Sequence, residues 1–397
     1  MKNIVMKEIK EDISLKKYAL NSLPVLQELR KQHFKTKSAV CIERAKYITE
    51  YMKTSEDAQE PTELMRAKAV NHYLSNREII FHDDNWLAGS STSKPLGASV
   101  YPELLGLSIW PELETISTRK ENPQLLSKED ADILNFDIYP YWMDRTVLEV
   151  ARAKINDSEN GDLHKALKLM EKIAFFMCGK TTTISHTTPH YVPVLHQGLD
   201  ALIKQAQEKE DEFENTEEKT IFYQAVQIAM QGILNYAKRV SEKAAELAEQ
   251  ESSPERKKNF QTMAEICAKV PANPAETYRE ALNSLWLCHI GILAENVNMA
   301  LNPGRLDQIL YPFFKNDVEK NTITIEEALT LTGGLWFKIA DNTNLVPQTA
   351  EKLFGGAGSV PAVTLGGVDQ DGNDAVNDLT YIMLKVTELL RIKDQYP

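Results

Sequence analysis

Apolar residues recur three and four positions apart along most of this sequence, which is the spacing that lines one face of an α-helix. The pattern is strongest over residues 162–177 and 217–250, where leucine, isoleucine, alanine and aromatic side chains follow that period. Both segments are therefore predicted to be amphipathic helices. The acidic run at residues 208–218, between them, is predicted to be a solvated loop or helix end.

Capping signals predict where further helices begin. A Ser, Thr, Asn or Asp side chain can accept a hydrogen bond from the first helical turn, and a glutamate three positions later can return one. The candidate caps are Ser252 with Glu255, Asn273 followed by Pro274, Thr324 with Glu327, and Asp374. Helices are therefore predicted to dominate the fold.

Strand candidates are few and short. Residues 360–368 form the best one, and residues 79–81 and 190–195 form weaker ones. Because helices follow these strands, the pattern favours an α/β barrel wrapped by many helices over a plain helical bundle. The sequence shows no internal repeat, low-complexity run or Pro/Ser-rich linker that would divide the chain.

Composition narrows the class of protein. The 397 residues are 43% hydrophobic and 26% charged, which is typical of a globular protein, and the net charge of −12 argues against binding to nucleic acid. No apolar run is long enough to span a bilayer, and residues 1–17 lack the apolar region of a secretory signal. Four scattered cysteines without a CxxC pair indicate free thiols in a reducing compartment. These features predict a cytoplasmic protein.

A glycine-rich stretch at residues 354–385, FGGAGSVPAVTLGGVDQDGNDAVNDLTYIMLK, suggests three kinds of element. A dinucleotide loop is disfavoured because Pro361 stands where GxGxxG needs its third glycine. A calcium loop is disfavoured because, counted from Asp369, the glycine is fourth instead of sixth and the twelfth position lacks a glutamate. A tight turn beside a barrel strand, followed by a helix capped at Asp374, explains the stretch better.

Two other motifs resemble ligand sites. Gly179-Lys180-Thr181 resembles the end of a phosphate-binding loop, but Ala174 replaces the glycine that such a loop requires. Residues 185–198 contain three histidines without the spacing of a metal site, so no metal is predicted.

Polar residues in two irregular segments are candidates for a substrate pocket. His186 and His190 lie in a proline-containing segment and are predicted to form hydrogen bonds with a substrate. Asn298 and Asn302 follow an apolar helix and could form a facing wall. Arg305 and Asp307 could instead be an ion pair that stabilises a loop; the residues alone leave the pocket wall and the stabilised loop equally open.

Several blocks together resemble the glycyl radical enzymes of the pyruvate formate-lyase type. The blocks are ERAKYITEYMK at 43–53, the segment 66–103 ending in YPE, SHTTPHYVPVLHQGLDALI at 185–203, NPGRLDQILYPFFKNDVEK at 302–320, and the glycine-rich stretch. Ser185 replaces the glycine usual in the third block. The blocks occur in the family's order and cover most of the chain, which is more specific than any single motif.

The resemblance implies a ten-stranded α/β barrel built from two half-barrels and wrapped by helices, of which this chain would form the first. It also implies radical chemistry. A radical-SAM activating enzyme installs a glycyl radical, this radical generates a thiyl radical on a cysteine, and the thiyl radical abstracts hydrogen from a small organic substrate. Full-length members of the family are expected to be homodimers.

The sequence departs from the family where the radical residues should follow. No cysteine has the GCxE context of the catalytic loop, and no RVxG-type glycyl motif is present. Residues 1–397 are therefore predicted to be one domain of the pyruvate formate-lyase type, ending before the catalytic cysteine. The chain would be a fragment or one subunit of a lyase, dehydratase or decarboxylase, inactive alone and completed by a C-terminal half or a complementing subunit.

The resemblance also guides the choice of site residues. His186, His190, Asn298 and Asn302 are predicted to contact substrate, and Arg305 with Asp307 is predicted to be the ion pair that supports their wall. The alternative is a non-catalytic helical binding protein derived from this family. The identity of the substrate is not predicted.

Overall fold

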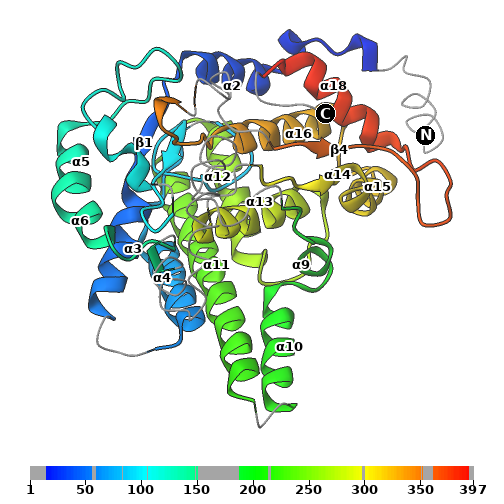
Figure 1. The fold of residues 1–397 in the computed structure, drawn as a ribbon. Coiled ribbons are helices and arrows are strands. Elements are labelled where there is room, and N and C mark those ends of the chain that lie inside the picture. Colours follow the sequence, from blue (N-terminus) through cyan, green and yellow to red (C-terminus); the bar gives the residue numbers. More distant parts are fainter. Residues whose placement is uncertain are drawn as a thin grey trace.

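Helices account for most of the computed structural model, which describes residues 15–55, 60–82, 84–104, 106–147, 149–150, 187–212, 216–296, 300–349, 351 and 361–392 (Figure 1). The N-terminal part contains the 3₁₀ helices η1 (Leu15–Lys17) and η2 (Leu20–Ser22), then α2 (Pro24–Lys35), α3 (Glu43–Thr54), α4 (Thr62–Asn76), η3 (Gly106–Glu112), α5 (Lys128–Ile133), the π-helical turn η4 (Leu134–Ile138) and α6 (Tyr139–Trp142). The later part contains α9 (Val192–Gln197), α10 (Leu199–Glu212), α11 (Glu217–Gln250), α12 (Pro254–Lys269), α13 (Tyr278–Glu295), α14 (Leu306–Ile309), α15 (Tyr311–Lys320), α16 (Ile325–Ala340) and α18 (Asp378–Leu390).

The predicted helix at 217–250 is confirmed as α11, which packs against α4, α10 and α12. Its C-terminal half is the more buried, with Tyr236, Val240 and Ala244 in the core. Helices α10 and α11 lie side by side and extend away from the rest of the molecule (Figure 1). The predicted helix at 162–177 lies outside the described residues.

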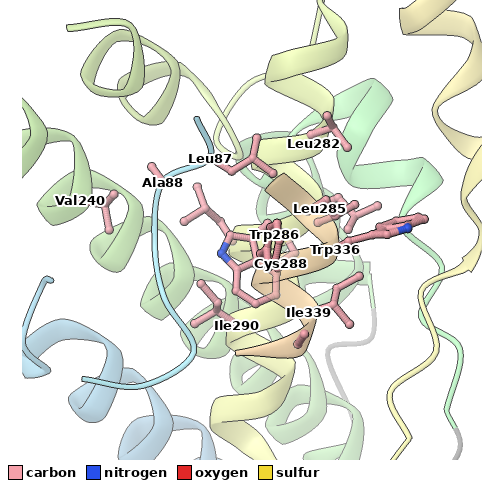
Figure 2. Packing of buried hydrophobic residues seen from close by; sticks show 14 of the residues in the cluster. Leu87, Ala88, Val240, Leu282, Leu285, Trp286, Cys288, Ile290, Trp336 and Ile339 are labelled. Atoms are coloured by element: carbon pink, nitrogen blue, oxygen red, sulfur yellow. The ribbon is translucent and has the colours of Figure 1, made fainter. Parts of the chain in front are cut away.

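Helix α13 runs through the centre of the core, and almost its whole length is buried. Leu282, Leu285 and Trp286 expose none of their surface, and α13 packs against α16 (Figure 2). Both helices begin with a reciprocal capping box, formed by Thr277 with Glu280 and by Thr324 with Glu327. The Thr324 prediction is confirmed.

Two short parallel pairs of strands lie among the helices. β1 (Ala39–Cys41) pairs with β2 (Gly97–Ser99), and single bridges add residue 125 beside β1 and residue 342 beside β2. β3 (Gly304–Arg305) pairs with β4 (Val363–Thr364). Parallel pairing between strands distant in sequence, with helices connecting them, agrees with the predicted helix-rich α/β class. The ten-stranded barrel remains a prediction.

Three predicted caps are wrong. Ser253, one residue after Ser252, stands at the N-cap position of α12, and its side chain forms no capping hydrogen bond. The Asn273 side chain donates to the carbonyl of Lys269 at the end of α12, while Thr277, four residues later, caps α13. Asp374 accepts from the amide of Val376, and Asn377 caps α18.

Two strand predictions also fail. Residues 190–195 were a weak strand candidate, but Val192–Gln197 forms α9, where Pro193 occupies the first turn. Residues 79–81 have no assigned strand. Short apolar runs do not distinguish a strand from a helical turn, so tertiary contacts decide. Of the best candidate, at 360–368, only Val363 and Thr364 are strand among the described residues.

No described helix is both long and apolar enough to cross a bilayer.

Candidate functional site

The four described members of the predicted site lie on segments that meet at β3 and β4. His190 and Asn302 belong to the predicted substrate contacts, and Arg305 and Asp307 to their support. His186 and Asn298 lie outside the described residues.

Asn302 joins three segments that are distant in sequence. Its backbone amide donates to the carbonyl of Thr187 at 3.0 Å, and its side-chain oxygen accepts from the amide of Ala362 at 2.6 Å. The contacts hold the segment that carries His190 beside β3 and β4. Gly304 adds a close approach, because a Cβ at this position would lie 3.1 Å from the Thr188 methyl group, and its φ of +82° favours glycine.

Arg305 binds the backbone of the turn that follows β4. Its guanidinium donates to the carbonyl of Gly366 at 2.5 Å and to the carbonyl of Val368 at 2.9 Å. One planar cation thus fixes two carbonyl groups of the turn in a forked geometry that lysine cannot reproduce. Gly366 and Gly367 have φ values of +63° and +83°, so the turn requires residues without a side-chain penalty.

Asp307 binds an amide of the same turn, whereas Arg305 binds its carbonyl groups. Its Oδ2 accepts from the Gly366 amide at 2.7 Å and from the Thr380 hydroxyl at 2.6 Å, and the residue has no exposed surface. Its backbone carbonyl accepts from the side chain of Asn377, the cap of α18, at 3.1 Å. Asp307 therefore connects β3, the turn and the start of α18.

The predicted ion pair between Arg305 and Asp307 is wrong. Among the described residues, no ion pair joins their side chains; each is occupied by the turn after β4, one by its carbonyls and the other by its amide. Buried backbone groups need partners, and a turn presents both kinds to the two side chains. Whether they support a substrate pocket remains a prediction.

The acidic end of the glycine-rich stretch is a tight turn, as its spacing predicts. The Asp369 carboxylate accepts from the amides of Asp371 and Asn373 at 2.9 and 2.8 Å, and Val368 forms an antiparallel bridge with Asp374. Hydrogen bonds from Asn373 lower the pKa of Asp369. Over the part of the chain that the structure describes, no group of three or more acidic, histidine or cysteine residues could hold a metal ion.

His190 is exposed at the end of its segment, and the next residue anchors it. Tyr191 is buried and forms a hydrogen bond of 2.9 Å between its hydroxyl and Nδ1 of His289, which stacks on Trp286. Burial lowers the pKa of His289 to about 3, so its ring is neutral at pH 7. The tyrosine lies within a recognised block, but nothing in the sequence pointed to a buried histidine as its partner.

A buried ion pair lies at the C-terminal end of α13. Arg44 donates to Glu103 at 2.6 Å and to the carbonyls of Ala294 and Glu295, while its guanidinium lies 4.0 Å from the centre of the Tyr101 ring. Burial disfavours the charge of Arg44, but Glu103 overrides this effect and the pKa of Arg44 lies above its usual value. The pair satisfies helix carbonyls that would otherwise lack donors.

The sequence motifs contain both partners of this contact but do not predict it. Arg44 belongs to the ERAK block and Glu103 to the YPE block, and the two blocks meet where α13 ends. Opposite charges within two distant motifs were the available signal.

The described cysteines do not form a catalytic loop. Cys41 lies in β1, Cys267 in α12 and Cys288 in α13, and all three are buried. Burial raises the pKa values of Cys267 and Cys288 to about 12. The described residues therefore position polar segments at β3 and β4 but contain no cysteine in a loop of the GCxE type.

Comparison with known proteins places these segments in context. Residues 19–394 match the family described as Pyruvate formate lyase-like. An isethionate sulfite-lyase from Nitratidesulfovibrio vulgaris is 32% identical over 365 residues, which is 88% of this chain and 43% of that protein. A trans-4-hydroxy-L-proline dehydratase from Clostridioides difficile is 30% identical, over 92% of this chain and 46% of that protein.

Solved structures agree. A glycyl radical enzyme from Archaeoglobus fulgidus superimposes with a TM-score of 0.84 at 32% identity, covering 94% of this chain and 48% of that one. The chain thus spans about half the length of the relatives it matches.

Proposed function

The chain belongs to the pyruvate formate lyase-like family of glycyl radical enzymes, and from this premise we propose that its 397 residues supply the substrate-positioning part of a lyase or dehydratase. Hydrogen-atom abstraction would come from a glycyl radical and a thiyl cysteine on polypeptide outside these residues. Here the chain's own residues bind and orient the substrate.

The observation that carries the proposal is the meeting of three recognised blocks at β3 and β4. Asn302 connects the His190 segment to both strands, and Arg305 with Asp307 fixes the turn after β4 from two sides. Rigid support of this kind is what an orienting site needs, because small displacements of a bound substrate strongly slow its reaction. His190, exposed on this framework, is the described candidate for a substrate hydrogen bond.

The substrate class follows from the kinds of relatives. The isethionate and hydroxyproline enzymes act on small polar molecules that lose sulfite or water, so we infer that this enzyme eliminates a leaving group from a small polar substrate. Polar imidazole and amide groups suit such molecules better than an apolar pocket would. No cysteine in the sequence has the GCxE context, and the described thiols are buried in helices and a strand, so turnover by the chain alone is not expected.

Fragment complementation tests the proposal. The chain is expressed anaerobically with its radical-SAM activase, with and without a C-terminal half carrying the cysteine loop and the glycyl motif of the isethionate or hydroxyproline relative. We expect release of sulfite or of the dehydrated product only when both halves are present, and a His190→Gln variant that raises KM more than it lowers kcat.

The control is Asp371→Asn, an exposed change in the tight turn at Asp369. Product formation by the chain alone would contradict the proposal. A stably folded chain that neither binds a C-terminal half nor supports turnover with it would favour a non-catalytic binding protein.

A further inference from the structure

A cavity of about 190 Å³ lies between α2, α16 and the segment before β2, on elements that do not include β3 or β4. The polar side chains in its lining are those of Gln32, His33, Thr36, His82, Ser90, Lys338 and Asp341. Helices α2 and α16 pack directly against each other beside it (Figure 1). Its volume is below that of sites for drug-sized ligands, so only a small molecule fits.

Lys338 is the unusual residue of this cavity. It exposes 8% of its surface, yet no carboxylate oxygen among the described residues lies within 4.0 Å of its ammonium group. The nearby Asp341 carboxylate accepts from the Ser91 hydroxyl at 2.6 Å instead. Buried charges are normally paired, because an unpaired one loses hydration without compensation. The cavity therefore presents an ammonium group that forms no direct ion pair with the described residues, although the Asp341 carboxylate lines the same wall.

His33 adds a second donor. Its ring lies 5.7 Å, centre to centre, from that of Phe337, the neighbour of Lys338 in α16. Burial lowers the pKa of His33, so at neutral pH its imidazole is neutral and carries one N–H group. The two hydroxyl groups are engaged: the Thr36 hydroxyl donates to the carbonyl of Gln32, and the Ser90 hydroxyl donates to that of Thr92.

We propose that this cavity binds a small inorganic oxyanion of the phosphate or sulfate class, with the Lys338 ammonium as its counter-charge and the His33 imidazole N–H as a second donor. The single cation and the limited volume exclude nucleotides and other polyanions, which the Asp341 carboxylate on the same wall also repels. The site is independent of the proposed catalytic function.

The test measures ligand-dependent stability of the full 397-residue chain. Melting temperatures are recorded over a series of phosphate and sulfate concentrations, with ionic strength held constant by chloride. These anions also stabilise proteins generally by exclusion from the surface, an effect that does not saturate. Specific binding adds an increment that levels off with concentration. Lys338→Met removes the ammonium group but keeps an unbranched side chain of similar size. Lys315→Met, which removes an exposed lysine, is the matched control.

We expect a saturable rise in melting temperature for the native chain and for Lys315→Met, and only the unsaturable component for Lys338→Met. Without added anion, Lys338→Met should melt at the same or a higher temperature, because Lys338 is mostly buried and forms no ion pair with the described residues. If Lys338→Met does not fold, His33→Phe and phosphorus NMR line broadening of phosphate on the native chain replace it. A series without saturation, or an equal response in Lys338→Met, overturns the proposal.

Discussion

Removing the Asp307 carboxylate should destabilise the turn after β4. Its Oδ2 holds the Gly366 amide at 2.7 Å and the Thr380 hydroxyl at 2.6 Å, with no exposed surface. Hydrogen bonds to a charged group contribute about 1.5–3 kcal/mol each, so two are worth about 3–6 kcal/mol. Relief from burying the charge offsets part of this, and Asp307→Ala should lower the free energy of unfolding by about 3 kcal/mol.

Urea unfolding followed by tryptophan fluorescence measures that loss, and hydrogen exchange of the Gly366 amide measures it locally. The local readout matters because a chain of this size need not unfold in one step. Asp307→Asn keeps one oxygen acceptor and should lose only about 1–2 kcal/mol. Asp371→Ala, exposed and in the neighbouring turn at Asp369, should change the stability by less than about 0.5 kcal/mol.

The reasoning fails if Asp307→Ala is no more destabilising than Asp371→Ala. It also fails if the Gly366 amide exchanges equally slowly with and without the carboxylate, since that amide would then have another partner.

Three further predictions concern other contacts. Arg44→Met should lower the free energy of unfolding by about 3–5 kcal/mol, because Glu103 then keeps a partly buried charge without a partner. Adding Glu103→Gln should recover part of this loss, as measured by urea unfolding. Purely additive effects in the double variant would contradict this prediction. Because the pKa of His289 is about 3 in the folded chain, the free energy of unfolding should fall as the pH decreases from about 6.5 toward 3. His289→Leu should make that decline shallower. An unchanged dependence of the free energy of unfolding on pH would refute the prediction. Gly198→Ala should lower the melting temperature more than Gly372→Ala, because both have φ near +80° but only the first places a Cβ 2.2 Å from the carbonyl oxygen of Ala272; equal effects would show that the clash is relieved.

Local signals in the sequence predicted much of the helical fold. The long period at 217–250 and the Thr324–Glu327 box both correspond to observed helices, because these patterns depend on residues one turn apart. The turn at Asp369 was predictable for the same reason, since its hydrogen bonds are local.

Non-local contacts were not predictable in this way. His190–Leu195 reads equally well as a strand or a helical turn, and packing made part of it α9. Asp307 stands two residues from Arg305, and proximity suggested an ion pair, but the turn from 366 to 368 offered each a better partner. The buried pairs Arg44–Glu103 and Tyr191–His289 join positions far apart in sequence, so only the fold reveals them.

The central claim is that these residues position a substrate but rely on radical groups outside them. It is tested most directly by anaerobic electron paramagnetic resonance after treatment with the activase, combined with product analysis. We predict no glycyl radical signal and no product from the chain alone, and both when a C-terminal half with the cysteine loop and glycyl motif is added. A glycyl radical signal with product from the 397 residues alone would contradict the account.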